Sequence, residues 1–229
     1  LLAEAGGNRW NIPREFGGDG ADNAEMLEVY RELASGSLLT TFILTQRNAA
    51  CQRIETSSND AIKQRLLRAL CDGKCFATVG ISHLTTSRQH MKSPAVVAAV
   101  DHNSPGYRLT GSVPWATAVL AADLLVTGGT LADGRQILAA IPTTREGVRV
   151  RAPIALMGLS SSQTSIVDLQ NVFVAADEIL HGPIERVMSS GTGGGAGSLG
   201  TSAVAIGTAQ GALRNFREEA DRRPELAEF

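Results

Sequence analysis

The chain has 229 residues, which allows one large domain or two modest ones. Hydrophobic residues make up 43% and charged residues 19%, as in globular proteins that bury a core. No uninterrupted apolar run reaches the roughly 18 residues that span a membrane. The net charge of −2 and the pI near 6.1 argue against a nucleic-acid surface. We therefore expect no nucleic-acid partner and no membrane span.

The first 73 residues predict three helices. The segment 24–35, AEMLEVYRELAS, follows Asp22 or Asn23 as the N-cap and ends at Gly36. The apolar segment 38–54 is too long for one strand and predicts a buried helix. A third helix begins after Ser58 or Asn59 and ends before Gly73. We expect an N-terminal helical domain over residues 1–73.

From Phe76 to about Leu180, short apolar runs alternate with turn residues, which predicts an antiparallel sandwich or barrel. We assign residues 74–182 to this middle β domain. Residues 183–229 are expected to form a linker and the first helix of a C-terminal helical domain. The inward face predicted for that helix holds Val204, Ala205, Ala209, Ala212, Leu213 and Phe216. The fold class is therefore α+β.

The glycine-rich stretch 191–200 contains a G-x-G-x-x-G pattern at Gly195, Gly197 and Gly200. A dinucleotide-binding loop of this kind follows a buried strand inside a βαβ unit, and neither surrounds this pattern. Glycine and serine are instead typical of a flexible connection. We therefore predict a linker here.

Trp115 and Thr117 are two residues apart in a strand-and-turn segment, so an extended chain would point both to one face. An indole beside a hydroxyl suits a flat heteroaromatic ligand with hydrogen-bonding atoms on its edge. The alternative is a Trp that closes the end of a barrel beside an ordinary strand Thr. The spacing alone favours that structural interpretation.

The histidines, the remaining hydroxyl cluster and the cysteines give weaker indications of a functional site. Ser82 and His83 are adjacent, which does not suit a nucleophile and its base, and His90, His102 and His181 lie in loop-like sequence typical of the surface. Thr85, Thr86 and Ser87 form either a donor cluster for a ring edge or phosphate, or a polar turn. The three cysteines, Cys51, Cys71 and Cys75, lack metal-site spacing, which indicates free thiols and a cytoplasmic location. No signal peptide is apparent, and both ends read as cut from a longer protein.

Five segments in order resemble the acyl-CoA dehydrogenase family of flavoproteins. They begin with NIPREFGGDG at 11–20 and continue with the entry to the β domain at 72–95. GYRLTGSVPWATAVLAADLLV at 106–126 is similar to the family segment that carries Trp-x-Thr, and MGLSSSQTSIVDLQNVFVAADEIL at 157–180 is similar to a further one. AIGTAQGAL at 205–213 resembles the first helix of the C-terminal bundle. The resemblance covers nearly the whole chain.

This resemblance implies FAD as the cofactor and places Trp115 on the isoalloxazine ring, with Thr117 near its N5 edge. A family motif, T-E-P-G-A-G-S-D, falls on GISHLTTS at 80–87 when the chains are aligned without gaps. In this register Phe76 takes an aromatic position, Gly80 takes the motif's Thr, and Thr85 and Thr86 take its Gly-Ser pair. The cofactor-binding residues are therefore expected to be Phe76, Gly80, Thr85, Thr86, Trp115 and Thr117.

The implied activity is α,β-dehydrogenation of an acyl-CoA thioester with hydride transfer to flavin N5, as in fatty acid metabolism. The catalytic base belongs to a part of the family fold that this chain does not contain. The partners implied are an acyl-CoA or related small molecule, an electron-transfer protein and further copies in a homodimer or homotetramer. Because Gly80 and Ile81 replace the family's Thr and Glu, a flavin-dependent monooxygenase on the same fold is an alternative. A non-catalytic binding or scaffold subunit is another, since a family Arg is missing and the R-x-x-F-G motif is degraded.

Overall fold

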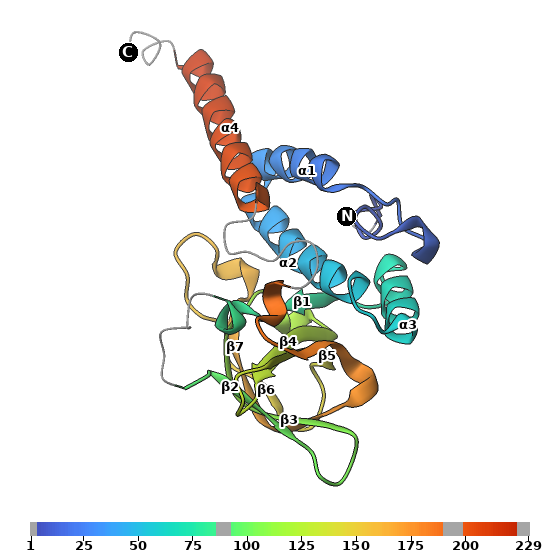
Figure 1. The fold of residues 1–229 in the computed structure, drawn as a ribbon. Coiled ribbons are helices and arrows are strands. Elements are labelled where there is room, and N and C mark those ends of the chain that lie inside the picture. Colours follow the sequence, from blue (N-terminus) through green and yellow to red (C-terminus); the bar gives the residue numbers. More distant parts are fainter. Residues whose placement is uncertain (1–3, 86–92, 190–198, 224–229) are drawn as a thin grey trace. The chain divides into compact units, whose positions relative to one another are not determined.

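The computed structural model describes residues 4–85, 93–189 and 199–223, and Figure 1 gives its ribbon. Thr86 and most of the glycine-rich stretch lie outside these residues. The linker and the Thr86 contact therefore stay predictions. The chain divides into two compact units. The first contains Leu1–Ala21 and Gln46–Ala196, and the second contains Asp22–Thr45 and Gly197–Phe229. The predicted domain limits at 73 and 182 stay a prediction.

The helices of the first half form as their caps and apolar patterns predict. They are α1 (Asn23–Gly36), α2 (Leu38–Glu55) and α3 (Asp60–Cys71). The Asp22 carboxylate accepts hydrogen bonds from the N–H groups of Ala24 and Glu25, and the Asn59 side chain accepts one from Ile62. These bonds satisfy N–H groups that a helix start leaves without partners. All three predicted helices are confirmed.

Among the described residues of the first unit, eight strands form one sheet. They are β1 (Ala77–Val79), β2 (Val96–Val100), β3 (Gly106–Ala116), β4 (Leu124–Thr130), β5 (Gln136–Pro142), β6 (Val148–Val150), β7 (Ser165–Ala175) and β8 (Ile179–Ile184). Their order is β6-β7-β3-β2-β4-β5-β8, with β1 paired to β4. The predicted α+β class is confirmed, but the sheet is mixed because β1 and β2 pair in parallel with β4. Long connections lead from both strands to β4, as parallel pairing requires.

The sheet lies between two apolar cores, and side chains of its central strands β4 and β5 belong to both. Along β4, Leu124 and Val126 face one core and Leu125 faces the other. This alternation follows from the two-residue period of a strand. The first core also contains side chains of α3 and the second half of α2, and the second core lies between β2, β3, β5 and β7. Both faces of β4 are therefore buried.

Two glycines before α1, Gly17 and Gly18, are required by the local backbone conformation and packing. Gly17 adopts φ 93° at the end of a short 3-10 turn, a conformation that suits glycine. A Cβ on Gly18 would lie 1.9 Å from the carbonyl oxygen of Ile12, so the turn closes only around a bare backbone. Nearby, buried Arg47 donates to the Asn11 side chain and to the carbonyl of Leu70. The segment before α1 is thus fixed to α2 and α3.

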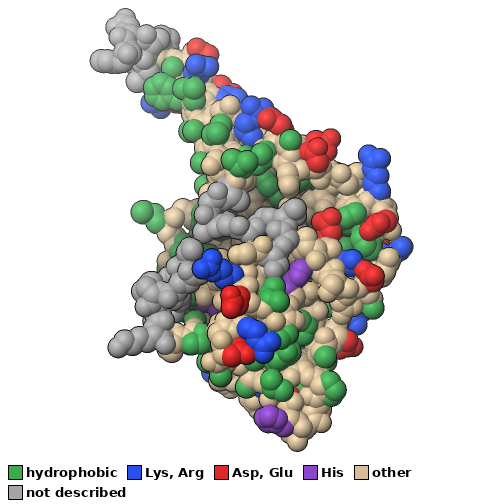
Figure 2. Space-filling model, viewed as in Figure 1, with side chains coloured by type: hydrophobic (Ala, Val, Ile, Leu, Met, Phe, Trp, Pro, Cys, Tyr) green, Lys and Arg blue, Asp and Glu red, His purple; other side chains and the backbone are tan. Residues whose placement is uncertain are grey.

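In the second unit, α4 (Leu199–Arg222) packs against α1 through small residues. A Cβ on Gly207 would lie 2.0 Å from the Arg31 carbonyl oxygen, and one on Gly211 would lie 2.2 Å from that of Ser35. The predicted inward face is correct at Val204 and wrong at Leu213 and Phe216, which are 50% and 67% exposed, as well as at Ala205, Ala209 and Ala212. The close approach of the two backbones selects the glycine side of α4. Figure 2 shows apolar side chains between the charged ones along α4.

Candidate functional site

Trp115 and Thr117 lie where β3 ends, and they differ sharply in exposure. The Trp115 side chain is 40% exposed, whereas Thr117 is fully buried. The prediction that both point to one face is wrong, because the strand stops at Ala116 and Ala118 turns the chain with φ 55°. The site at this turn therefore has an exposed indole and a covered hydroxyl.

Thr117 belongs to a chain of three buried hydroxyl groups, which we call the hydroxyl chain. The Thr117 Oγ1 lies 3.1 Å from Thr164 Oγ1, and Thr164 Oγ1 lies 2.8 Å from Ser162 Oγ. All three residues are fully buried. Each hydroxyl has one proton to donate and two lone pairs to accept. In the hydroxyl chain, either oxygen of each link can therefore be the donor.

Backbone bonds hold the hydroxyl chain in place. The Ala118 N–H donates to the Ser162 carbonyl at 2.8 Å, and the Thr78 hydroxyl donates to the Thr117 carbonyl at 2.6 Å. Gln163, between the two hydroxyl residues of the loop, has φ 51°. Left-handed conformations at Ala118 and Gln163 are costly for non-glycine residues and persist only where the surroundings enforce them. The turn after β3 and the loop before β7 are therefore locked together.

β1 brings Gly80 to the same turn. A Cβ on Gly80 would lie 3.6 Å from the Ala116 Cβ and only 2.6 Å from Val113 Cγ1. The Gly80 N–H donates to the Val126 carbonyl, and its carbonyl accepts from Thr127 at 2.6 Å. Gly80 thus contributes close packing, with both backbone groups bonded inside the sheet.

The other predicted contacts have local partners. Phe76 is partly buried, and its N–H donates to the Asp123 carboxylate at 2.8 Å. The Thr85 hydroxyl donates to the Ser82 carbonyl at 2.8 Å. The sequence interpretation did not single out Thr78, Ser162 or Thr164. The only available signal was the Ser/Thr-rich run 160–165 inside the segment that resembles the family.

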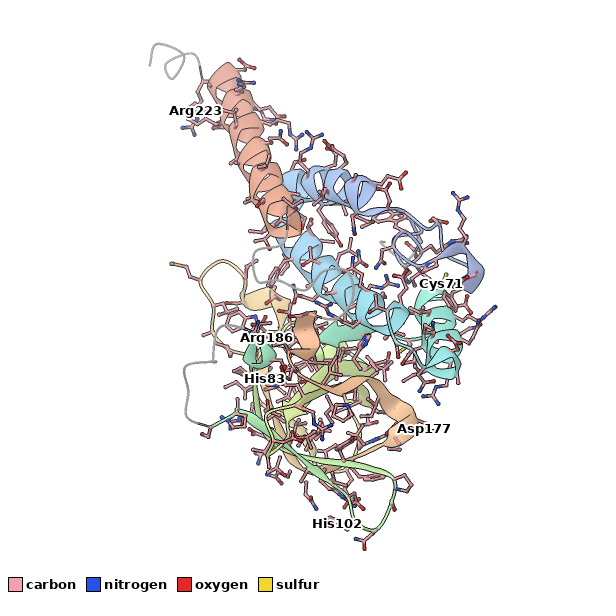
Figure 3. All side chains as sticks on the ribbon, in the orientation of Figure 1. Cys71, His83, His102, Asp177, Arg186 and Arg223 are labelled. Atoms are coloured by element: carbon pink, nitrogen blue, oxygen red, sulfur yellow. The ribbon has the colours of Figure 1, made fainter. Side chains whose placement is uncertain are left out.

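The histidines and cysteines offer no nucleophile or metal centre in the described part of the chain. Figure 3 shows His102 at the β2–β3 turn, where it is exposed as predicted, and His83 in the β domain. His83 is buried, with Nε2 3.0 Å from the Gly128 carbonyl. The surface prediction is wrong for partly buried His181, and His90 lies outside the described residues. Burial raises the pKa of Cys51 and of Cys75 to about 11, so both thiols stay protonated near neutral pH. Among these residues, no cluster of His, Cys, Asp and Glu could hold a metal ion.

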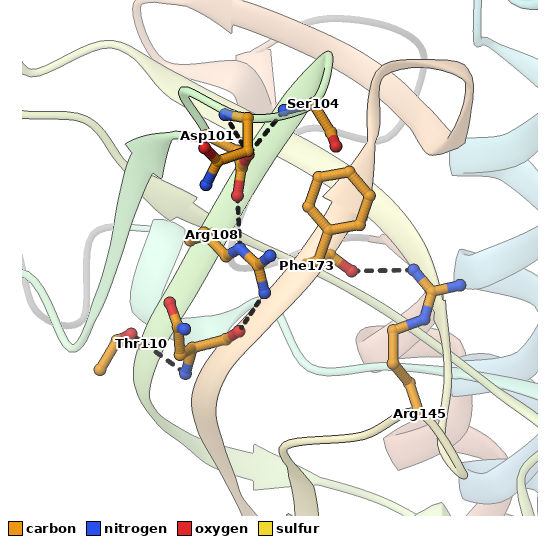
Figure 4. Close-up of polar contacts among 8 residues, drawn as sticks. Asp101, Ser104, Arg108, Thr110, Arg145 and Phe173 are labelled. Carbon is orange, nitrogen blue, oxygen red and sulfur yellow. Dashed lines mark hydrogen bonds and ion pairs between the residues drawn. The ribbon is translucent and has the colours of Figure 1, made fainter.

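A pocket of about 520 Å³ lies elsewhere on the first unit, and none of the predicted flavin residues lines it. Its walls include Arg108, Arg145, Phe173 and Glu178. Arg108 is held by Asp101 and stacks over the Phe173 ring at 4.9 Å (Figure 4), and both Glu178 oxygens accept from Arg145. Because these charges pair with each other, we place the candidate site at the Trp115 turn instead.

The Trp115 turn fits a flavin in its chemistry. The exposed indole supplies a flat apolar surface, and the hydroxyl chain supplies donors and acceptors for a ring edge. Thr117 is covered, so its hydroxyl meets a ring only after the atoms that cover it move aside. No helix in the described residues is long and apolar enough to cross a membrane.

Comparisons with known proteins bear on the family and the fold of the chain. Residues 1–74 match the profile of the acyl-CoA dehydrogenase N-terminal domain. The chain is 32% identical to a dibenzothiophene monooxygenase of Mycolicibacterium goodii, over 90% of this chain and 52% of that protein. It is 26% identical to a protein of Bacillus subtilis strain 168 named as a probable acyl-CoA dehydrogenase, over 88% of this chain and 54% of that protein.

The chain thus spans about half the length of the curated relatives it matches. Among solved structures, butyryl-CoA dehydrogenase from Megasphaera elsdenii superimposes with a TM-score of 0.79 at 21% identity, covering 97% of this chain and 60% of that one. That likeness concerns the fold. The profile thus assigns residues 1–74 to the acyl-CoA dehydrogenase family, and the chain as a whole is similar in sequence to a probable member of that family and has the same fold.

Proposed function

We propose that this protein is part of a flavin-dependent oxidoreductase that binds FAD at the Trp115 turn and acts as a monooxygenase on a small, flat substrate. The observation that carries the reaction class is the higher identity to the dibenzothiophene monooxygenase than to the acyl-CoA dehydrogenase relative. Dibenzothiophene is the first substrate to test. When bound, the reduced flavin would activate dioxygen, so that one oxygen atom enters the substrate and the other leaves as water.

The packing at Gly80 supports this choice over acyl-CoA chemistry. The family motif has a Thr where this chain has Gly80, and a Cβ there would lie 2.6 Å from Val113. A Thr at this position requires neighbouring side chains to shift. The packing around Gly80 therefore leaves no room for the Thr of the family motif unless the Val113 side chain moves.

The residues of this chain would bind and orient the ring. Trp115 would pack on the isoalloxazine, and the Thr117 hydroxyl would lie at its N5 edge. Phe76, Gly80, Thr85 and Thr86 are the further cofactor contacts that we propose. Stacking against an aromatic ring contributes about 1 kcal/mol beyond the area it buries. A fixed ring orientation also lowers the entropic cost of the reaction.

Dehydrogenation of an acyl-CoA thioester is the second candidate, favoured by the family profile over residues 1–74 and by the order of the five segments. In that case the partners would be an acyl-CoA and an electron-transfer protein. A homodimer or homotetramer is proposed for either reaction. A non-catalytic subunit is the remaining candidate, and it predicts that no flavin is bound.

The visible spectrum of the purified full-length protein, with FAD and separately with FMN, tests the proposal. We expect flavin bands that stay with the protein on gel filtration, and their absence with both flavins would refute a flavoenzyme. Reduced flavin, oxygen and dibenzothiophene should then give an oxygenated product. Bleaching of the flavin by an acyl-CoA without oxygen, with no oxygenated product, would instead establish the dehydrogenase.

Replacement of the indole locates the flavin. Trp115→Ala should weaken flavin binding about tenfold, since it removes the stacking surface. The matched control is Trp10→Ala, which removes the other Trp of the chain, a partly buried side chain remote in sequence from the turn. Equal affinities for Trp115→Ala and the parent protein would place the flavin elsewhere. Titration of flavin fluorescence measures both variants.

A further inference from the structure

We propose that His181 is a pH-sensitive contact between helix α2 and strand β8, which holds the helices on the sheet at neutral pH and weakens that attachment in mild acid. The contact lies where the end of α2 and the residues after it meet β8. We call this place the α2–β8 junction and define it by Arg53, Thr56, Ser57, Leu180 and His181. All five residues belong to the first unit, and no flavin is needed for the role.

Hydrogen bonds join the two sides of the α2–β8 junction. The His181 Nε2 lies 3.2 Å from the Arg53 carbonyl oxygen and 3.2 Å from Thr56 Oγ1. Next to it, the buried Ser57 hydroxyl donates to the Leu180 carbonyl at 2.7 Å. Leu180 itself is buried in the apolar core that contains side chains of α2 and α3. The junction therefore attaches these helices to the edge of the sheet.

The partners of the His181 ring determine where its hydrogen lies. A carbonyl oxygen only accepts, so Nε2 carries the hydrogen and donates it to Arg53. The single proton of the Thr56 hydroxyl goes to the Gln52 carbonyl at 2.9 Å, so this hydroxyl also acts as an acceptor toward Nε2. The neutral ring thus has its hydrogen on Nε2. A second proton would bind at Nδ1 and make the ring cationic.

The surroundings of the ring disfavour that cation. Burial is the largest cause and lowers the pKa of His181 below its usual 6.5. The hydrogen bond to the Arg53 carbonyl raises this pKa and the Arg53 guanidinium lowers it, each by less than burial does. The Arg53 residue is only 5% exposed, so little water screens its charge. Protonation of His181 therefore places a second positive charge beside a buried one.

Other elements near the junction do not compensate this charge. On the side of the sheet, β5 pairs Leu138 with His181 and adds an apolar side chain. Glu55, at the end of α2, interacts with the charges of Glu15 and Lys63. The carboxylate just before β8 is held by its arginine partner. Among the described residues, the charged side chain that acts on the ring is the arginine of the junction.

The direction of the pH effect follows from proton linkage. In the unfolded chain His181 takes up a proton near its usual pKa of 6.5, whereas in the folded chain its pKa is lower. The unfolded state therefore binds more protons just below pH 6.5. Stability that is complete above pH 6.5 is lost as the pH falls toward the folded-state pKa, and the loss levels off once both states are protonated.

Urea denaturation of the full-length protein and of His181→Gln, at about pH 7.5 and about pH 5.5, tests this role. Glutamine also presents an N–H group to the Arg53 carbonyl, but it takes up no proton. The ratio of unfolding constants, parent over variant, should rise as the pH falls. Linkage to one proton limits the rise to about tenfold at one pH unit below 6.5. A ratio that stays constant would refute the role of His181.

The matched control is His102→Gln, which replaces an exposed histidine at the β2–β3 turn. Its unfolding constant should follow that of the parent protein at both pH values. A rise in its ratio equal to that of His181→Gln would show that the response is not specific to the junction.

NMR titration of the parent protein decides the matter even if His181→Gln does not fold. The imidazole C–H signals of His181 should give an inflection below pH 6.5, and an inflection at or above that value would overturn the proposal. Where the variant folds, hydrogen exchange locates the response when both proteins are compared at the same acid pH. Residues 53–59 should exchange faster in the parent protein than in His181→Gln, and equal exchange there would refute a weakened junction.

Discussion

The two ends of the β3–β7 strand pair are held by different chemistry. At one end, Tyr107 pairs with Val174, and nearby Arg145 forms two hydrogen bonds of 2.5 Å to Glu178. At the other end, Ala116 pairs with Ser165, and the bonds come from the neutral hydroxyl chain. The first end is charged and partly exposed, and the second is uncharged and buried.

The two ends differ in what their hydrogen bonds can do. A guanidinium and a carboxylate have fixed roles as donor and acceptor, so their bonds have only one direction. A hydroxyl can exchange those roles at no cost in charge. The charged end can stabilise the strand pair but offers little to a neutral ring edge. The hydroxyl end is neutral and contains both donors and acceptors.

The largest effect is expected from breaking the charged end. Arg145→Ala leaves the Glu178 carboxylate, only 17% exposed, without its ionic partner, and should cost about 2 kcal/mol of unfolding free energy. The control is Arg135→Ala, whose pair with Asp133 is about half exposed on both sides, so its loss should cost much less than the loss of Arg145. Urea denaturation measures both variants. Equal losses would show that burial does not strengthen the first pair.

A smaller effect is expected at the hydroxyl end. Thr78→Val removes the donor to the buried Thr117 carbonyl and should cost about 1 kcal/mol. Thr143→Val removes a comparable bond to the Ala122 carbonyl at a partly exposed position, where water can replace the hydroxyl. We expect its cost to be lower. A Thr143 variant that loses as much stability as the Thr78 variant would contradict the role of burial at this end.

The smallest effect is a difference in pH dependence between the two ends. Burial raises the pKa of Glu178, but hydrogen bonds from Arg145 and the Ala175 N–H lower it by more, so the net pKa lies below its usual 4.5. The stability from this pair is present above pH 4.5 and is lost as pH falls through the folded-state pKa. The Arg145→Ala penalty should thus shrink between pH 7 and pH 3. The Thr78→Val penalty should stay constant, and a parallel decline would mean that acid acts on the whole fold.

Local signals in the sequence were sufficient for the helices and for most of the fold class. Asp22 and Asn59 were predicted as candidate caps, and both accept hydrogen bonds from the first turn of their helices. Capping depends on residues a few positions apart, so the sequence contains all of it. The parallel pairing of β1 with β4 depends on partners nearly fifty residues apart, and no local pattern predicts it.

The site was predicted only in part for the same reason. Trp115 is exposed in a way that suits a ring, but its relation to Thr117 depends on where β7 stops pairing with β3. The bond between Thr117 and Thr164 joins residues 47 positions apart, and neither has a distinctive sequence pattern. Likewise, the buried side of α4 consists of glycines whose partner is the backbone of α1, which hydropathy does not reveal.

The close approach of α4 to α1 has a consequence for biosynthesis. Gly207 and Gly211 contact carbonyls of Arg31 and Ser35, so the second unit joins segments from opposite ends of the described chain. A ribosome releases α1 long before α4, and contacts so distant in sequence form slowly. During that interval the surface of α1 that α4 later covers stays open to solvent and to chaperones. Completion of this helix pair should therefore be a late event in the maturation of the protein.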